Sequence, residues 1–209
     1  MALRLYDYTL SGSCYKVRLL LGFLDLDHEK IAVDFYPGRE HKQPDFLEIN
    51  PLGQLPVLED GALRLRDAQA ILAYLAKRYD PSGQWLPEDP ELFGEVMMWL
   101  AFAGGELMAA SAARLHDTLG YRLDIDQARK GARAAFRLLD DHLAERAIFD
   151  KTWLASDQPT IADIACFPYV ALAGDGGLGH EDYPCLRNWM HAFRRLDRFH
   201  AMSGIPEFV

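Results

Sequence analysis

The chain has 209 residues, half of them hydrophobic and a quarter charged, which is typical of a globular protein with room for two domains. The formal net charge is −9, and no dense basic run occurs, so the sequence lacks the electrostatic footprint of a nucleic-acid binder. With neither a signal-peptide stretch nor an uncharged apolar run near the ~20 residues of a membrane helix, we expect a soluble, cytoplasmic protein with no membrane partner.

The first 80 residues carry signals of alternating strands and helices. Strands are expected at 3–6, 28–33, 57–59 and 62–65, and helices at about 14–24 and around 71–79. A polar loop is expected over 36–44. Asp60-Gly61 separates the last two strands and is a strong hairpin signal. The order β-α-β-β-β-α predicts an α/β domain over 1–80, with helices on the faces of a mixed sheet.

The rest of the chain has only helical periodicity. Three prolines and a glycine between Pro81 and Pro90 place a linker at 81–91. Beyond it, apolar residues recur at helical spacing over 92–107, 128–143 and 186–196. Short connections between helices favour antiparallel neighbours, so residues 92–209 are expected to form an all-α bundle.

Two turns in the first domain have the residues of a ligand site. Pro56 precedes a strand, and a cis Leu55–Pro56 bond would turn the N–H and C=O groups of Leu55 outward to pair with a peptide-like ligand. Asp67 lies where a strand turns into a helix. It is either an ordinary N-cap or, with the first amides of that helix, a holder of the charged end of an amino acid.

A third motif serves folding. Thr160 and Asp163 have the spacing of a capping box, in which the acid reaches back to the backbone of the cap residue. On this basis Asp163→Ala should cost about 0.5–2 kcal/mol of stability and leave turnover intact.

Together, the segment Asn50 to Leu58, the Asp67 turn and the Thr160–Asp163 box resemble the glutathione transferase superfamily across essentially the whole chain. The resemblance implies a thioredoxin-like N-terminal domain, a helical C-terminal domain, a homodimer and glutathione as co-substrate. It would place the cysteinyl backbone of glutathione at Gln54, Leu55 and Pro56, and its γ-glutamyl end at Asp67 and Ala68. The family commonly has serine where this chain has Ala68, which removes one hydroxyl donor. His41 and Lys42 lie in the loop that often contacts the glycine carboxylate of glutathione in the family. The alternative is that both are exposed cations of a solvated loop.

The chemistry requires a thiolate, which a hydroxyl donor and the positive end of a helix both favour. By the resemblance, Ser11 holds the position of a thiolate-stabilising serine. Ser13 is the expected N-cap of the following helix and the alternative catalytic hydroxyl. We interpret Tyr6 as a packing residue. Cys14 lies too late in the sequence to align with the reactive cysteine of cysteine-type members of the family, although a mixed disulfide between Cys14 and glutathione remains an alternative.

The function expected from these residues is conjugation of glutathione to a small apolar electrophile bound between the domains, with Tyr8, Phe102 and Tyr121 as walls. Glutathione-dependent peroxide or disulfide reduction, or a non-catalytic binding protein of the same fold, are the alternatives. No metal is expected, because His180, His191 and His200 lack ligand spacing on one helix face.

Overall fold

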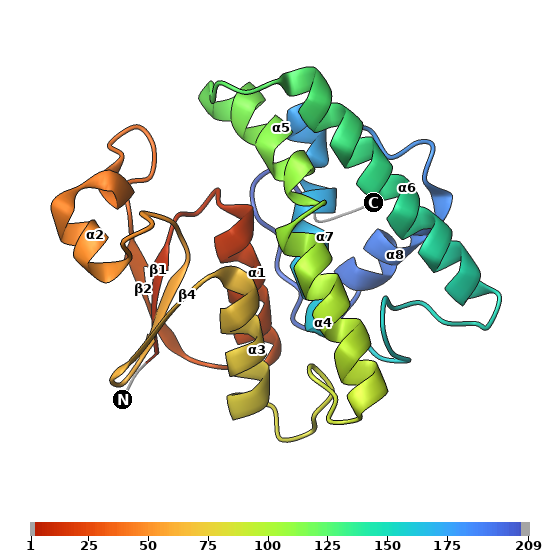
Figure 1. Cartoon of the computed structure of the whole chain (residues 1–209). Helices are drawn as coiled ribbons and strands as arrows, with labels where there is room; N and C mark the ends of the chain where they lie inside the picture. Colours follow the sequence, from red (N-terminus) through yellow and green to blue (C-terminus); the bar gives the residue numbers. More distant parts are fainter. Residues whose placement is uncertain (1–2, 206–209) are drawn as a thin grey trace.

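The computed structural model describes residues 3–205 and has an α/β part followed by a helical part (Figure 1). The α/β part contains the strands β1 (Leu3–Asp7), β2 (His28–Ala32), β3 (Val57–Asp60) and β4 (Leu63–Arg66), with the helices α1 (Gly12–Phe23), α2 (Pro44–Ile49) and α3 (Ala68–Tyr79) and the 3₁₀ turn η1 (Glu40–Lys42). The helical part contains α4 (Pro90–Gly104), α5 (Met108–Leu119), α6 (Ile125–Ala147), α7 (Ile161–Ala171), η2 (Ala173–Gly176) and α8 (Pro184–Arg194).

The sheet is mixed, with strand order β2-β1-β3-β4. β1 and β2 are parallel, whereas β3 is antiparallel to both β1 and β4. Asp60 pairs with Leu63 across the Asp-Gly turn, and Gly61 there has a φ of +61°, a conformation that glycine adopts without strain. The predicted mixed sheet and the predicted hairpin are therefore confirmed.

The helices α1 and α3 pack on one face of the sheet and separate it from the helical part, whereas α2 lies on the other side (Figure 1). Val17, Leu20 and Leu21 of α1 are fully buried in the main core, and Phe46 of α2 closes a smaller cluster on the opposite face. Burial of these apolar residues holds α1 against the face of the sheet and so positions the loop that leads into α1.

The helix α7 is the centre of the helical part. Every one of its residues is buried, and it contacts α1, α3, α4, α5 and α8. Its N-terminus carries the predicted capping box: the Thr160 side chain accepts from the helix backbone, and the Asp163 carboxylate accepts from the Thr160 N–H at 2.9 Å. The box is thus confirmed.

The helices differ from the sequence prediction in three places. The first helix begins at Gly12, two residues before the predicted start, because Ser11 and not Ser13 caps it. Residues 44–49 form α2, with Pro44 in its first turn, where a missing N–H is harmless. The single helix predicted from the apolar residues over 92–107 ends at Gly104, and a second helix, α5, begins at Met108.

The segment Pro90–Leu119 is long and apolar enough to cross a membrane by length and composition alone. It consists of two helices, α4 and α5, which pack against α7 and α6 respectively. The core helix of a soluble protein passes the same test.

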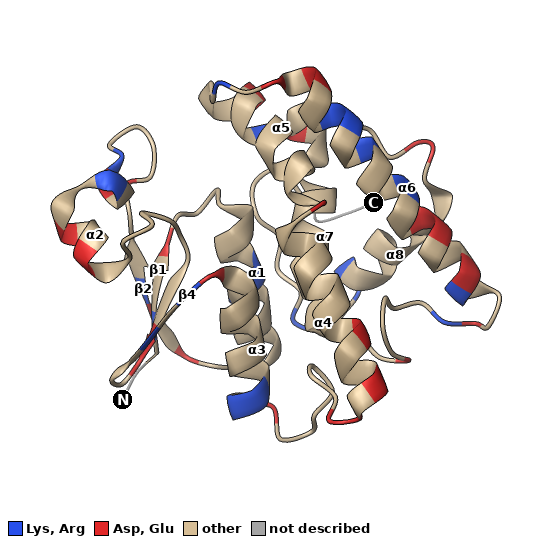
Figure 2. Cartoon of the chain, in the orientation of Figure 1, with Lys and Arg blue, Asp and Glu red and all other residues tan. Residues whose placement is uncertain are grey.

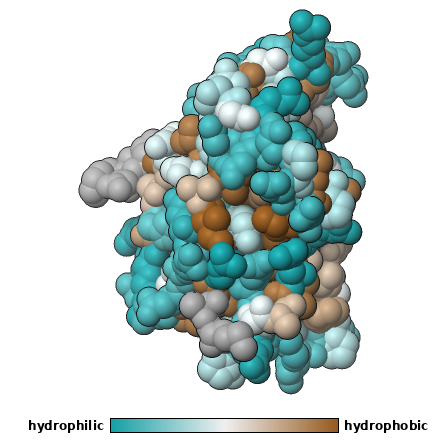
Figure 3. All heavy atoms as spheres, turned by 90° about the vertical axis from the view of Figure 1, so that its left-hand side faces the viewer, coloured by the Kyte–Doolittle hydropathy of each residue, from teal (hydrophilic) through white to brown (hydrophobic). Residues whose placement is uncertain are grey.

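Charged residues lie along α6 and at the ends of α3 and α4 (Figure 2). The basic residues Lys77 and Arg78 lie in the last turn of α3 and Glu91 in the first turn of α4, where each complements the helix dipole. Seen from the side of the sheet, the surface is largely hydrophilic, with apolar side chains in small patches (Figure 3).

Candidate active site

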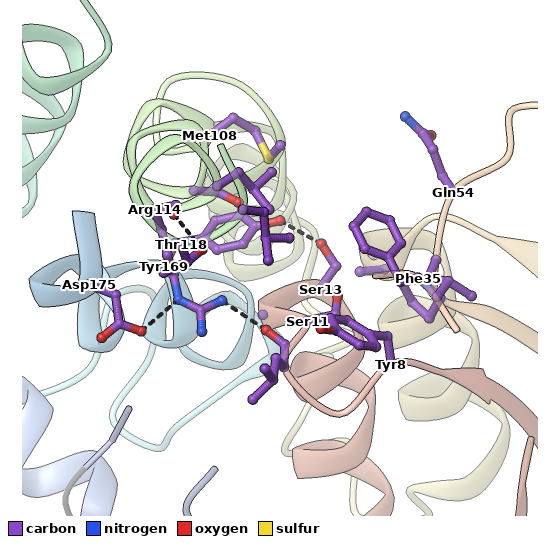
Figure 4. A pocket seen from close by; sticks show the side chains of 18 of the residues that line it. Tyr8, Ser11, Ser13, Phe35, Gln54, Met108, Arg114, Thr118, Tyr169 and Asp175 are labelled. Carbon is purple, nitrogen blue, oxygen red and sulfur yellow. Dashed lines mark hydrogen bonds and ion pairs between the residues drawn. The ribbon is translucent and has the colours of Figure 1, made fainter. Parts of the chain in front are cut away.

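A cavity of about 630 Å³ lies between the N-terminus of α1 and the helices α5 and α7 (Figure 4). Its walls come from both parts of the chain. It brings together most of the candidate residues chosen from the sequence, namely Ser11, Ser13, Gln54, Leu55, Pro56, Asp67 and Ala68. His41 and Lys42 are not among the lining residues.

Ser11 is the N-cap of α1. Its backbone is extended, with φ −79° and ψ 120°, and its Oγ accepts the N–H of Cys14 at 3.2 Å. Among residues 3–205 no acceptor takes the Ser11 hydroxyl proton, so this proton is available to a ligand. A half-buried hydroxyl therefore stands at the positive end of a helix dipole, an arrangement that favours a bound anion.

Ser13 does not cap the helix, contrary to expectation. Its Oγ lies 2.6 Å from the Tyr169 hydroxyl, so the two side chains form a hydrogen bond that joins α1 to α7 (Figure 4). Because α1 starts at Gly12, Ser13 lies inside the first turn, and its side chain is free to point across the cavity. Tyr169 was not among the predicted site residues, because it lies in an apolar run typical of a core helix.

The loop before β3 is held by two side chains that do not line the cavity. Asn50 is buried and donates from Nδ2 to the carbonyl of Gln54 at 2.8 Å, while its Oδ1 accepts the N–H of Leu52 at 3.1 Å. Lys42 donates from Nζ to the carbonyls of Gly53 (2.7 Å) and Leu52 (3.2 Å). The Leu55–Pro56 peptide that follows is cis, as predicted.

His41 is not the exposed cation expected from the sequence. The residue is 2% exposed and its ring stacks on Phe35, with centroids 4.0 Å apart. Burial lowers the pKa of His41, helped by the positive charges of Lys42 and Arg39, so the imidazole is neutral at pH 7. Phe35 in turn stacks on Tyr8, and these two rings form an aromatic wall of the cavity.

Asp67 acts as the N-cap of α3. Its Oδ1 accepts the N–H groups of Gln69 and Ala70, both at 3.0 Å. Its φ of +75° turns the chain sharply from β4 into the helix, which brings Asp67 and Ala68 to the cavity wall. The Oδ2 atom has no protein donor among residues 3–205, so the carboxylate is still able to accept from a ligand ammonium.

The helical part supplies the opposite wall. Arg114 of α5 donates from Nε to Asp175 at 2.9 Å and from Nη1 to the carbonyl of Leu10 at 2.8 Å, which ties the loop before Ser11 to the helical part (Figure 4). Of the three aromatic walls expected from the sequence only Tyr8 lines the cavity; Phe102 is buried in the core, and Tyr121 lies at the surface beyond the end of α5.

Cys14 lies beneath the cavity wall and is fully buried. Burial raises the pKa of its thiol to about 12, and the negative charge of Asp7 acts in the same direction. A thiol of this kind is protonated at neutral pH and is a poor nucleophile. Tyr6 packs edge-on against Phe46, in agreement with its interpretation as a packing residue.

Comparison with known proteins decides the family. A family model of the glutathione S-transferase N-terminal domain matches residues 5–83, and the corresponding model of the C-terminal domain matches residues 65–199. The chain belongs to the glutathione S-transferase family. This assignment accounts for the thioredoxin-like front half and the helical back half, and confirms the resemblance drawn from the motifs.

Individual relatives agree with the glutathione S-transferase assignment. The chain is 31% identical to a maleylacetoacetate isomerase from Pseudomonas aeruginosa, with 88% of each chain covered. A glutathione S-transferase structure from Pseudomonas fluorescens is 30% identical and superposes with a TM-score of 0.86, covering 97% of this chain and all of that one. A glutathione transferase homologue from Drosophila mojavensis, crystallised with bound glutathione, is 25% identical with a TM-score of 0.83, covering 94% and 89%.

Proposed function

We propose that this glutathione S-transferase relative conjugates the thiolate of glutathione to an electrophile, and that the Ser11 hydroxyl stabilises the thiolate. The observation that carries the proposal is the place of Ser11 in the cavity, at the N-terminus of α1 and with its hydroxyl proton uncommitted among residues 3–205. A donated hydrogen bond and the helix dipole both favour the charged form of a sulfur bound there.

The rest of glutathione extends from this point along the α/β wall. The Asp67 carboxylate and the backbone N–H of Ala68 hold the γ-glutamyl end, and the backbone of Leu55 pairs with the cysteinyl residue in strand fashion. Lys42 is the cation of the loop near the glycine carboxylate, since His41 is neutral there. Because Ala68 offers no hydroxyl, the Asp67 corner binds with one donor fewer than is common in the family.

The electrophile occupies the side formed by the helical part. Met108, Leu115 and Leu119 give this side an apolar surface, which supports a small apolar molecule as co-substrate. Arg114 and Thr118 lie among them, so one end of this compartment is polar. The same site serves glutathione-dependent peroxide or disulfide reduction in the alternative function, and glutathione binding alone in the non-catalytic one.

The test is titration of the thiolate absorbance of the glutathione complex in wild type, Ser11→Ala, Ser13→Ala and Cys14→Ala. A hydrogen bond to a charged group contributes about 1.5–3 kcal/mol, so Ser11→Ala should raise the pKa of the bound thiol by about one to two units. It should slow conjugation, with glutathione affinity little changed. Ser11→Gly keeps most of the stability of the cap but has no hydroxyl, so it should raise the pKa of the bound thiol as Ser11→Ala does, which separates the hydroxyl from the cap.

Other outcomes would overturn the assignment in distinct ways. An effect of Ser13→Ala alone would place the activating hydroxyl two residues later. Accumulation of a glutathione mixed disulfide that Cys14→Ala abolishes would establish cysteine chemistry. If the protein binds glutathione tightly but does not conjugate it, consumption of peroxide would indicate a glutathione-dependent peroxidase. If peroxide is not consumed either, the protein would be a non-catalytic glutathione-binding protein.

We also propose that the protein is a cytoplasmic homodimer. Phe93, Met97 and Met98 are exposed apolar residues on α4, which supports burial of this face against a second copy. Light scattering after size exclusion should give twice the chain mass, and Met98→Glu should shift the protein to the monomer. A monomeric wild type would refute this part of the proposal.

A further inference from the structure

The exposed charges of α6 are segregated by sign along the helix (Figure 2). Asp126 lies in the first turn, where it complements the helix dipole. Beyond it, the exposed charged residues are basic in the first half of the helix and acidic in the second half. They form the charged face of α6, which consists of Lys130, Arg133, Arg137, Asp141 and Glu145. The sign therefore changes once along this face, beside Leu138.

This order of charges brings no benefit within one chain. Side chains three or four residues apart are neighbours on a helix, and all but one of these neighbouring pairs on the charged face have the same sign, so they repel. The exception is Arg137 with Asp141, but there the basic residue comes first, which is the weaker orientation. Glu145 also lies in the last turn, where the helix dipole disfavours a negative charge.

Most charges of this face also lack partners elsewhere in the chain. Among residues 3–205 only Arg137 forms an ion pair, at 3.7 Å from Asp140, and its guanidinium lies over the Tyr183 ring. The other four side chains of the face are exposed and have neither an ion pair nor a side-chain hydrogen bond in the described residues. They are therefore free to pair with charges of another molecule.

Large apolar side chains are exposed along the same helix. Leu138 is half exposed where the sign of the charge changes, and Ile148 and Phe149, directly after α6, are 76% and 71% exposed. Tyr121, shortly before α6, is exposed as well. Apolar groups thus lie at the middle and near both ends of α6, which is the arrangement that a symmetrical contact between two copies requires.

A second copy of α6 complements this order of charges when the two helices lie antiparallel with a two-fold axis near Leu139. Arg137 then faces Asp141 of the second copy. Arg133 faces Glu145 of the second copy, and the symmetry repeats both pairs. The exposed apolar residues near the two ends of α6 also meet. A parallel arrangement in register would instead bring like charges together, so the charges select the antiparallel one.

We propose that the charged face of α6 is a self-association surface, on which two copies of this chain pair antiparallel about a two-fold axis near Leu139. This surface is separate from α4, because α6 packs on α5 and α8 whereas α4 packs on α7. It therefore stays free when two α4 faces pair, and it joins such dimers into larger assemblies. Exposed ion pairs are weak and are screened by salt, so the α6 contact is dissociated during size exclusion at about 150 mM salt.

Analytical ultracentrifugation at high protein concentration tests the proposal. The quantity to measure is the ratio of the average mass at about 50 mM salt to that at about 500 mM salt, where charges are screened within a few ångströms. This ratio does not depend on how many chains the α4 contact joins. It should reach at least two in the wild type. In the Met98→Glu monomer it should stop at two, because a contact about a two-fold axis closes on itself.

Charge reversal identifies the surface. Asp141→Lys/Glu145→Lys makes the whole face basic, and Lys130→Glu/Arg133→Glu makes it mostly acidic, so each variant alone should give a ratio of one. An equal mixture of the two variants should recover the association, because a basic face then meets an acidic one. Recovery in the mixture also shows that both variants are folded.

Asp45→Lys/Glu48→Lys is the matched control. Both residues are exposed on α2, which lies in the α/β part, and the double variant changes the net charge as much as Asp141→Lys/Glu145→Lys does. It should keep the ratio of the wild type. A wild-type ratio of one, a wild-type ratio retained in either reversal variant, or no recovery in the mixture would overturn the inference. Growth beyond twofold in the Met98→Glu monomer would overturn the antiparallel pairing.

Discussion

Replacing Asp163 by alanine is expected to destabilise the protein far more than the loss of a helix cap. The carboxylate is fully buried and accepts three N–H groups: the backbone of Thr160 at 2.9 Å, the backbone of Leu154 at 3.0 Å, and the indole of Trp189 at 2.9 Å. It therefore joins the start of α7 to the segment before it and to α8. Removal leaves three buried donors without an acceptor.

The size of the effect follows from these three bonds. Each unsatisfied buried donor costs about 1–3 kcal/mol, so the sum lies near 3–9 kcal/mol and we expect about 5 kcal/mol. The capping pattern in the sequence predicted only about 0.5–2 kcal/mol, because it shows the bond within α7 and not the bonds to Leu154 and Trp189.

Urea unfolding followed by far-UV circular dichroism, at one fixed protein concentration, measures the difference. Asp89→Ala is the matched control, since Asp89 caps α4 at the surface by accepting from Glu91 and Leu92, and it should cost about 0.5–2 kcal/mol. Asp163→Asn keeps one acceptor oxygen and should fall between the two. A cost for Asp163→Ala no larger than that for Asp89→Ala would refute the reasoning. Asp163 does not line the cavity, so turnover per folded molecule should be unchanged.

Two further predictions rest on titrating groups. Cys14, whose thiol pKa is raised to about 12 by burial and by Asp7, should resist iodoacetamide at neutral pH in the folded protein; rapid labelling there, measured by mass spectrometry, would contradict its burial. The hydroxyls of Tyr74 and Tyr79 donate to Asp60 and hold the pKa of its carboxyl below the ordinary value of 3.8, so its stabilising contribution is complete above that value and is lost as the pH falls through the lower folded value. The stability difference between wild type and Asp60→Asn should therefore stay constant above about pH 5 and shrink as the pH falls below 3.8, and a difference that stays constant at low pH would count against the assignment.

Several elements of the fold follow from local chemistry and could be predicted from the residues alone. Asp60-Gly61 specifies the hairpin because glycine takes a positive φ there, and Thr160 with Asp163 marks the start of a helix because the two satisfy its first N–H groups. The cis peptide bond before Pro56 was also predicted, because residues 54–57 open a strand at the edge of the expected ligand site. The shortest helix, α2, was missed since six residues show too little of the helical period.

Tertiary structure decided which side chains meet in the cavity. Ser11 and Ser13 are equally suitable caps by type, and only the path of the chain into α1 assigns the cap to Ser11 and turns Ser13 toward Tyr169. His41 looks like a surface cation in sequence, yet stacking on Phe35 buries it and removes its charge. The Ser13–Tyr169 contact joins segments far apart in the chain, and the stacking of His41 depends on how the loop after Phe35 folds back, so no pattern of residue types encodes either outcome.

The same holds for the charge under Tyr169. In sequence, Lys16 is one basic residue in an amphipathic helix, where a solvated position is the ordinary outcome. Its burial follows from the packing of α1 against α7, which places the ammonium over a ring from the far end of the chain. Because the free energy of a charge depends on the groups around it in space, only the folded chain shows that this lysine lies against a residue of the cavity wall.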